Sequence, residues 1–431
     1  MNYNETLSYL FSRLPMFSRI GSAAYKADLT NTIKLCDALG NPQNTFKSIH
    51  IAGTNGKGSV SHILAAILQT AGYKTGLYTS PHLKDFRERI KIDGKMVEED
   101  FVVDFTKRID PLIEEIEPSF FEITVAMAFE YFALHKVDIA IIEVGLGGRL
   151  DSTNIITPEL CIITNIGRDH MNLLGNSIEE IAFEKAGIIK PRVPVIIGET
   201  LPETRPVFEN IAAKMGAPIV FAHEKRWIAD WHIHDHLLEI SVAANELDNE
   251  HKNYKLDLPG IYQLRNILPV IEAVHILNEK GWKIEEKHLQ EALPQVKKLT
   301  GLHGRWEVVR QHPTVVIDVG HNEDGIKQLV QQLEVTDFEH LHIIMGFVKD
   351  KEIATVLTLL PKNASYYFTK AQIPRALPEE ELAAMAEIAG LKGHAFPEVN
   401  IALQTALAKA ERNDLILVCG SVFLVGEVNM V

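Results

Sequence analysis

The sequence predicts an α/β protein in which a phosphate-loop domain with a mostly parallel sheet precedes a smaller, Rossmann-like α/β domain. Short apolar runs alternate with helix-like segments along most of the 431 residues, as in parallel sheets covered by helices on both faces. A glycine-rich turn joins one apolar run to a long apolar helix within residues 47–72. A short basic segment with a glycine, residues 297–303, separates two series of such runs. These observations predict two domains, residues 1–296 and 304–431, joined by a linker at 297–303.

After the glycine-rich turn, the first domain continues with short apolar runs that we expect to form strands, at 74–80, 137–146, 160–167, 193–199 and 217–222. Residues 223–257 instead alternate apolar and polar side chains, which predicts a small antiparallel β patch at the edge of this domain. A helical stretch follows at roughly 261–293.

The second domain repeats the order of strand and helix after the linker, with apolar runs at 314–320, 341–347, 364–369 and 415–420. Two α/β domains joined by one short linker are expected to enclose a cleft, which is a common place for a ligand.

Charge and cysteine content exclude several classes of protein. A formal net charge of −14 argues against a nucleic-acid binder, although an anionic substrate remains open if basic residues gather in one place. The three cysteines, Cys36, Cys161 and Cys419, are too far apart for a disulfide framework or a thiolate zinc site. The chain shows no secretion signal and no run of about 18 apolar residues, so we expect a cytoplasmic protein that does not enter a membrane.

The glycine-rich turn has the composition of a phosphate-binding loop, and its residues are Gly53, Thr54, Asn55, Gly56, Lys57, Gly58 and Ser59. Glycines let backbone N–H groups approach phosphate oxygens, and a helix N-terminus and a lysine add positive charge. The alternative is an ordinary glycine turn with a solvated lysine, which the order strand, loop, helix disfavours. Gly58 stands where the usual loop has a magnesium-binding Ser or Thr, so a magnesium ion needs ligands from elsewhere.

Three polar side chains just beyond expected strand ends are candidate magnesium ligands: Ser80, Glu143 and His170. In open α/β sheets, ligands bind at the carboxyl ends of the strands. Ser80 could instead begin a turn before Pro81, and His170 could be an ordinary loop histidine. Glu143 interrupts an apolar run, and a carboxylate at a buried strand end needs a partner.

Lys185 is an anomaly in an expected helix. Ile178, Ile181 and Ala182 form an apolar stripe at helical spacing, and Lys185 falls on the same stripe. Helical geometry leaves two readings open, a buried lysine with a special role or a lysine that reaches solvent from the edge of the stripe.

Taken together, these motifs resemble those of folylpolyglutamate and dihydrofolate synthases, which are members of the Mur ligase superfamily. The first half carries HIAGTNGKGS, TSPHL, EVGLGGRLDSTN, GRDH and EKAGIIK in the family order. The second half continues with GIYQLRN, GRWEV, DVGHNEDG, TKAQIPRA and CGSVFLVGE. The resemblance therefore covers nearly the whole chain.

The resemblance implies an ATP-dependent ligase of folate biosynthesis and one-carbon metabolism. Such an enzyme adds L-glutamate to a folate, giving tetrahydrofolate polyglutamates, and to dihydropteroate, giving dihydrofolate, through an acyl phosphate. The implied cofactors are ATP and Mg²⁺. The implied partners are small-molecule substrates alone, neither nucleic acid nor membrane, and the expected form is a monomer.

The resemblance also implies roles for individual residues. Lys57, His170 and Lys185 would be catalytic, and a carbamylated Lys185 would join Ser80, Glu143 and His170 around the metal. Asn266, Arg305 and Asp318 would bind ATP together with the phosphate loop. Asp151 would lie on the pterin side of the substrate, and His321 and Ser421 near the incoming glutamate.

Some features depart from the family or lie outside it. His303 and Gly320 replace residues that are commonly Pro and Ala in the family, which affects only local loop shape. His232, His234 and His236 alternate in the sequence as the ligands of a metal site can, but such alternation is ordinary in a half-exposed strand.

The competing functions are another Mur-type amino-acid ligase and a non-ligase P-loop nucleotide-binding protein. The number of glutamates added and the preferred folate form stay open.

Overall fold

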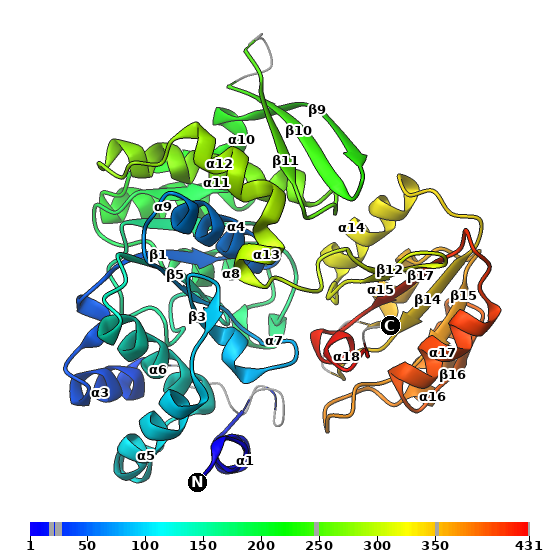
Figure 1. The fold of residues 1–431 in the computed structure, drawn as a ribbon, viewed down its shortest axis with the longest axis horizontal. Coiled ribbons are helices and arrows are strands. Elements are labelled where there is room, and N and C mark those ends of the chain that lie inside the picture. The colour runs from blue at the N-terminus through cyan, green and yellow to red at the C-terminus, as the bar shows by residue number, and fades with distance from the viewer. Residues whose placement is uncertain (17–20, 22–27, 245–249, 350–352, 430–431) are drawn as a thin grey trace. The chain divides into compact units, whose positions relative to one another are not determined.

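A computed structural model describes residues 1–16, 21, 28–244, 250–349 and 353–429 (Figure 1). It divides into two compact units, one of Met1–Asp257 with Gln263–Leu302 and the other of Leu258–Tyr262 with His303–Val431. Among the described residues, no helix combines the length and apolarity that crossing a membrane requires.

The first unit is built on a sheet with strand order β4-β3-β2-β5-β1-β6-β7-β8. All neighbours from β2 to β8 pair in parallel, whereas β3 and β4 add an antiparallel edge beside β2. The strands are β1 Lys47–Ala52, β2 Thr75–Tyr78, β3 Ile90–Ile92, β4 Lys95–Met96, β5 Ile139–Glu143, β6 Leu160–Ile163, β7 Val195–Ile197 and β8 Ile219–Phe221.

Helices cover both faces of this sheet, which is why its central strands β5 and β6 are buried along their whole length. Helix α4 follows the glycine-rich turn and is buried from Gly58 to Leu68, because α11, α12 and α13 pack over it. The helices are α1 Tyr3–Arg13, α3 Thr30–Ala38, α4 Lys57–Thr70, α5 Glu99–Ile116, α6 Phe120–Leu134, α7 Met171–Leu174, α8 Ile178–Ala186, α9 Arg205–Met215, α10 Ala222–Lys225, α11 Gln263–Glu279, α12 Glu286–Ala292 and α13 Val296–Thr300, with short 3₁₀ turns at Pro42–Asn44, Phe86–Arg89 and Leu293–Gln295.

The predicted β patch is a three-stranded antiparallel sheet of order β11-β10-β9, formed by β9 Trp227–His234, β10 Leu237–Ala243 and β11 Lys252–Leu256. Residues 245–249 of the expected patch lie outside the described residues. His232 and His234 lie on β9, where His232 Nε2 pairs with Glu239 at 3.0 Å, and His236 lies in the following turn.

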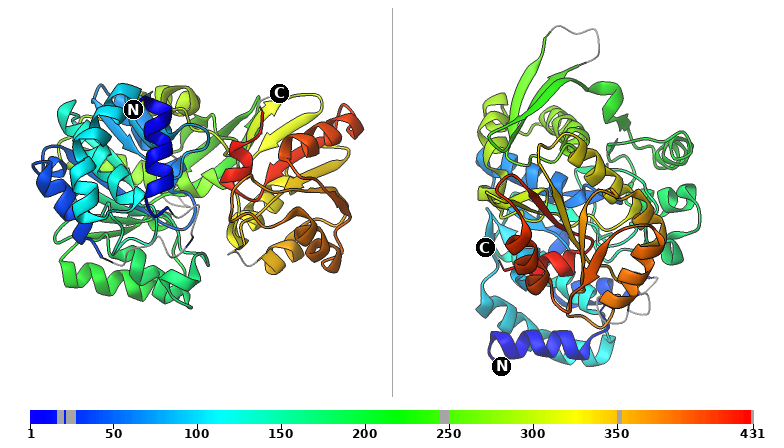
Figure 2. Two further views of the ribbon diagram at one scale, coloured as in Figure 1. Left: turned by 90° about the horizontal axis from the view of Figure 1, so that it is seen from below. Right: turned by 90° about the vertical axis from the view of Figure 1, so that its right-hand side faces the viewer.

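The second unit has a six-stranded sheet of order β12-β13-β17-β14-β15-β16, parallel except for β12. Its strands and helices are the yellow to red part of the ribbon in Figure 2. Helices α14, α15 and α16 pack on one face through a shared apolar cluster, and α17 contacts β14 and β15. The elements are β12 Glu307–Arg310, β13 Thr314–Ile317, β14 Leu341–Met345, β15 Ser365–Phe368, β16 Gly393–Ala395, β17 Leu415–Cys419, α14 Glu323–Glu334, α15 Ile353–Leu359, α16 Glu379–Ile388, α17 Val399–Lys409 and α18 Val422–Gly426.

The fold class predicted from the sequence is confirmed in both units. The segment 297–303, which was expected to be a linker, is partly helical: residues 297–300 belong to α13 and to the first unit. Lys91 Nζ donates to the carbonyl of Thr300 at 2.7 Å, and His62 Nδ1 bonds the Thr300 hydroxyl at 2.8 Å. These partners are more than two hundred residues away in the sequence, so a linear pattern could not indicate them.

Candidate active site

The phosphate loop spans the gap between the end of β1 and the start of α4. Gly53 has φ +147° and Gly56, the N-cap of α4, has φ +85°, which are conformations that residues with a side chain rarely adopt. A Cβ on Gly53 would lie 1.8 Å from the hydroxyl oxygen of Thr164, and one on Gly56 would lie 2.3 Å from the side-chain oxygen of Asn266. Both glycines are therefore required by conformation and by space.

Residues that follow β6 hold the loop in place. The hydroxyl of Thr164 donates to the carbonyl of Asn55 at 2.5 Å, and the side-chain oxygen of Asn165 accepts the Asn55 N–H at 2.8 Å. The Gly167 N–H donates to the hydroxyl of Thr54 at 2.9 Å. The sequence prediction missed Thr164 and Asn165, because it placed them inside the run expected as a strand at 160–167, whereas β6 ends at Ile163 and leaves them at its carboxyl end, where ligand sites form.

We expect Gly53→Ala to abolish nucleotide binding and to lower the free energy of unfolding, because the new methyl group would overlap the Thr164 hydroxyl. A strained φ alone costs about 1–3 kcal/mol. Gly72→Ala is the matched control, since Gly72 has φ +90° but no atom within 4 Å of its Cβ position. Calorimetric titration with ADP and urea unfolding of both variants would check this. Equal losses of ADP affinity in the two variants would contradict it.

The side chain of Lys57 lies over the loop. Its Nζ donates to the carbonyls of Gly53 and Thr54 at 3.1 and 3.2 Å. The first N–H groups of α4 lack intrahelical partners and point toward the same region. An ammonium and a helix N-terminus thus converge where a bound phosphate would sit.

Lys185 reaches the base of the same loop from α8. Lys185 is 4% exposed, and its ammonium donates to the Gly53 carbonyl at 3.0 Å. In the described part of the chain, no carboxylate forms an ion pair with it. Burial, with Lys57 nearby as a second cause, lowers the pKa of Lys185 to about 7. The reading in which this lysine reaches solvent is therefore wrong.

The candidate metal ligands stand at the carboxyl edge of neighbouring strands. Glu143 ends β5 and is 5% exposed, and β5 lies between β1 and β2 in the sheet. Ser80 follows β2 by two residues, and His170 lies beyond β6 at the N-cap of α7 with φ +52°. The sheet thus places these residues and the phosphate loop along one edge.

In the ranges that the structure describes, no three His, Cys, Asp or Glu side chains converge on a ready metal site. Glu143 and His170 supply two such groups, and Ser80 supplies a hydroxyl. Mg²⁺ keeps several waters and bridges to phosphate oxygens, so it needs few protein ligands. A carbamate on Lys185 would add an anionic oxygen donor, and the buried amine with its lowered pKa fits that chemistry.

Asp151 organises the loop after β5. One carboxylate oxygen accepts the N–H groups of Gly145 and Leu146 at 3.0 and 2.9 Å, and the other accepts the N–H and the hydroxyl of Thr153. The side chain is 3% exposed, and burial raises its pKa. Its role as a substrate contact stays a prediction, and the geometry shows a carboxylate whose oxygens both serve its own loop.

Gln263, which the sequence prediction also missed, begins α11 beside the phosphate loop. Its amide nitrogen donates to the hydroxyl oxygen of Ser59 at 3.0 Å, and its amide oxygen accepts from Asn266 Nδ2 at 2.8 Å. The side-chain oxygen of Asn266 therefore faces Gly56, since a Cβ on Gly56 would lie only 2.3 Å from it.

The second unit gathers its candidate residues at the carboxyl ends of β13 and β17, which are neighbours. Asp318 follows β13 and accepts hydrogen bonds from the Tyr262 hydroxyl at 2.6 Å, the Trp306 N–H at 2.7 Å and the Gly320 N–H at 2.8 Å. Burial raises its pKa, and Arg305 opposes that shift. His321 Nδ1 donates to the Val319 carbonyl at 3.0 Å, and Ser421 caps α18.

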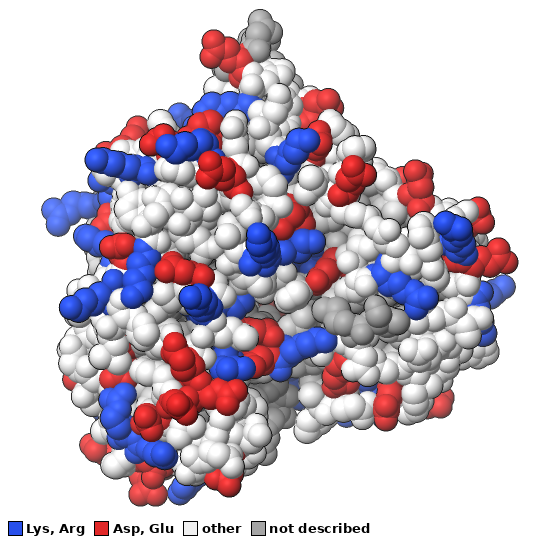
Figure 3. Space-filling model, viewed as in Figure 1, with Lys and Arg blue, Asp and Glu red and all other residues white. Residues whose placement is uncertain are grey.

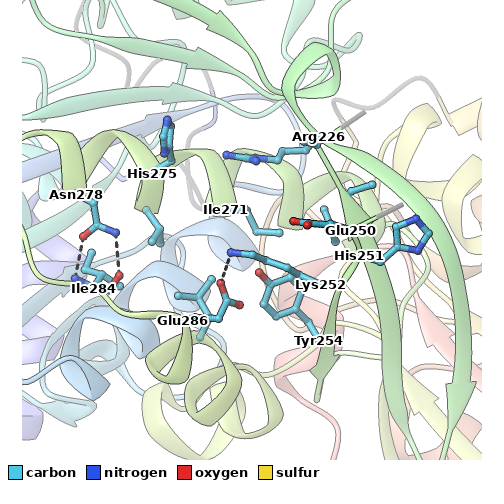
Figure 4. Close-up of a pocket in the computed structure, with 15 residues that line it drawn as sticks. Arg226, Glu250, His251, Lys252, Tyr254, Ile271, His275, Asn278, Ile284 and Glu286 are labelled. Carbon is cyan, nitrogen blue, oxygen red and sulfur yellow. Dashed lines mark hydrogen bonds and ion pairs between the residues drawn. The ribbon is translucent and has the colours of Figure 1, made fainter. Parts of the chain in front are cut away.

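A cavity of about 540 Å³ lies elsewhere in the first unit, between β10, β11, α11 and α12 (Figure 4). Its charged side chains are paired within the fold, as Arg226 contacts Glu272 at 3.1 Å and Lys252 contacts Glu286 at 2.6 Å. None of the predicted site residues lines it. On the face shown in Figure 3, acidic and basic side chains of the described residues are interspersed, and no continuous basic surface is seen.

The chain matches two family descriptions, "Mur ligase middle domain" over residues 51–274 and "Mur ligase, glutamate ligase domain" over residues 304–422. It is similar to the dihydrofolate synthase/folylpolyglutamate synthase of Bacillus subtilis, with 33% identity over 99% of this chain and 98% of the relative. It is also similar to the folylpolyglutamate synthase of Lacticaseibacillus casei, with 31% identity over 99% and 98%.

Solved structures resemble it over the same extent. The Mycobacterium tuberculosis folylpolyglutamate synthase complexed with ADP superposes with a TM-score of 0.87 at 30% identity, covering 98% of this chain and 96% of that one. E. coli FolC in complex with DHPP and ADP superposes with a TM-score of 0.84 at 29% identity, covering 99% and 96%.

Proposed function

Because the chain belongs to the folylpolyglutamate and dihydrofolate synthase family of Mur ligases, we infer that it joins L-glutamate to folates and to dihydropteroate in an ATP-dependent reaction. The observation that supports this function best is the phosphate loop, where the ammonium groups of Lys57 and Lys185 both donate to the Gly53 carbonyl. The relatives are named as synthases of this reaction, and both solved structures described above are complexes with ADP. The alternatives, another Mur-type amino-acid ligase or a non-ligase nucleotide binder, are not favoured.

The reaction proceeds in two balanced steps. A carboxylate oxygen of the folate attacks the γ-phosphorus of ATP, which forms an acyl phosphate and releases ADP. The glutamate amine then attacks the acyl carbon, and the tetrahedral intermediate collapses to an amide with loss of inorganic phosphate and a proton. Charge builds on the phosphoryl oxygens in the first step, so positioned cations contribute most of the catalysis.

We assign the phosphate loop, residues Gly53 to Ser59, to the ATP phosphates, with Lys57 as the residue that neutralises the transferring group. Asn266, Arg305 and Asp318 are further nucleotide-binding residues in this proposal. His321 and Ser421 bind the incoming glutamate, and Asp151 contacts the substrate on its pterin side. These roles rest on the match of the residues to family motifs. The positions of the phosphate loop, Asp318 and Ser421 at the carboxyl ends of strands and of Asn266 beside Gly56 support them.

Ser80, Glu143, His170 and a carbamylated Lys185 would hold Mg²⁺. The ion, when bound, offsets negative charge on the phosphates. Carbamylation requires the neutral amine of Lys185, which adds to the carbon of CO₂ and loses one proton, giving a carbamate anion. Burial of that amine and its lowered pKa support the assignment. Such a change converts a buried cation, which is costly, into an anion that can pair with the metal.

We also propose a monomer that acts in the cytoplasm, where ATP is available, and that binds neither nucleic acid nor membrane. The negative net charge supports the absence of nucleic acid.

A product assay tests the reaction. We expect one purified protein to add glutamate both to dihydropteroate and to tetrahydrofolate, seen by mass spectrometry as products heavier by one or more glutamyl groups. ATP hydrolysis should require both the acceptor acid and glutamate, which a nucleotide switch would not need. Product from tetrahydrofolate but none from dihydropteroate would refute the ligation of glutamate to dihydropteroate. Ligation of a different amino acid to a different acid would refute both activities.

A further inference from the structure

We infer that Gln263 is a positioning residue of the nucleotide site, which sets the Ser59 hydroxyl as a hydrogen-bond donor to the phosphates of ATP. The inference rests on the proposed function, since it takes the phosphate loop as the ATP site. It concerns a residue outside the loop, on the first turn of α11.

The contacts of Gln263 are buried and directional. Its side chain is 0% exposed, and that of Ser59 is 1% exposed. The Gln263 amide nitrogen lies 3.0 Å from the Ser59 oxygen, and its amide oxygen lies 2.8 Å from Asn266 Nδ2. Both ends of the carboxamide are thus engaged, one by α4 and the other by α11.

The donor and acceptor atoms of the three side chains determine the direction of the hydrogen bonds between them. An amide nitrogen only donates and an amide oxygen only accepts, so donation runs from Asn266 to Gln263 and from Gln263 to Ser59. The Ser59 oxygen uses a lone pair for the Gln263 N–H, and its own hydrogen must point to another acceptor. A phosphate oxygen is an acceptor and nothing else, so it is the partner that this arrangement fits.

The same contacts fix Asn266. Because its nitrogen is directed to Gln263, its oxygen faces Gly56, where a Cβ would lie only 2.3 Å away. Gln263 therefore couples the first turn of α11 to both the middle and the end of the phosphate loop. Removing its two polar groups should leave the loop without a fixed hydroxyl direction and Asn266 without a fixed amide orientation.

The test compares ADP affinity in four single variants, Ser59→Ala among them, and one double variant by calorimetric titration of the full chain. We expect Gln263→Met, which keeps the volume of the side chain, to weaken ADP binding about tenfold, equivalent to about 1.4 kcal/mol. Gln263→Glu, of the same length, should weaken it further, because its carboxylate accepts the Ser59 hydrogen and repels phosphate. Gln69→Met is the matched control, since Gln69 lies at the other end of α4 and donates to the Leu299 carbonyl at 3.0 Å. It should bind ADP like the parent.

The double variant Ser59→Ala/Gln263→Met shows whether Gln263 acts through Ser59. If it does, the double variant binds ADP no more weakly than Ser59→Ala alone, because coupled residues are not additive. Steady-state kinetics should show a raised KM for ATP with an unchanged KM for glutamate. Additive losses, or parental ADP affinity in both Gln263 variants, would overturn the inference. The product assay is read separately, so a wrong substrate assignment would leave these binding results interpretable.

Discussion

Lys57→Ala is expected to lower kcat about a thousandfold, which corresponds to several kcal/mol of barrier, while leaving the protein folded. The ammonium lies over the phosphate loop, 3.1 Å from the Gly53 carbonyl, and a transferring phosphoryl group gains charge that it would stabilise. Its own contacts are two loop carbonyls, so the truncation leaves the apolar core of α4 intact.

The measurement is single-turnover formation of ADP with saturating acid, together with circular dichroism to monitor folding. Lys74→Ala is the control, because Lys74 is exposed and its Nζ donates to the carbonyl of His135. It lies four residues beyond Thr70, the end of α4 that is opposite to the phosphate loop. We expect parental rates for that control. Near-normal ligation by folded Lys57→Ala would remove the assignment of this loop to ATP.

Lys185→Ala is expected to lose most activity and to regain part of it with a short carboxylate such as acetate in the buffer. The carboxylate would occupy the space of the lost side chain and supply the anionic oxygen that a carbamate provides. Lys185→Met, of similar volume, leaves no such space and should not be rescued. Equal response of the two variants to acetate would contradict a role for a carboxylate at this position.

The pH dependence of the Lys185 modification has a defined sign. Because burial lowers the pKa of the folded protein's Lys185 to about 7, the reactive neutral amine is scarce below that pH and abundant above it. Activation by bicarbonate should therefore increase as the pH rises through 7.

In bicarbonate-free buffer, the unfolded chain binds more protons at Lys185 than the folded chain does, between pH 7 and the ordinary lysine pKa of 10.5. The free energy of unfolding should then rise with pH across this window, and less so in Lys185→Met. Incorporation of ¹³C from labelled bicarbonate, followed by NMR, would detect the carbamate directly.

Much of the site was predictable because its residues occur in short motifs at strand ends. The phosphate loop could be predicted from Gly53 to Ser59 alone, since a strand, a glycine turn and an apolar helix occur in sequence. Glu143 and Lys185 could be singled out because a charged residue within an apolar run or stripe needs an explanation. The resemblance to a family then supplied roles that composition and spacing do not contain.

The residues that hold the site in place were not predictable, because their partners are distant in the chain. Thr164 contacts Asn55 across 109 positions, and Gln263 contacts Ser59 across 204. Nothing in the neighbourhood of either residue in the sequence indicates its partner. Where a linker was expected at 297–303, Thr300 likewise bonds two residues that are distant in the sequence, Lys91 and His62.

The sequence by itself indicated two series of strands that alternate with helices, the order of these elements along the chain and the composition of the phosphate loop. These features depend on local pattern and residue type. Only the tertiary structure decided whether Lys185 is buried or exposed and how Asp151 uses its carboxylate. It also decided that β2, β5 and β6, the strands that precede Ser80, Glu143 and His170, lie near one another in one sheet. Burial and hydrogen bonding depend on what packs against a side chain, and that packing is set by parallel pairing of strands that are far apart in sequence.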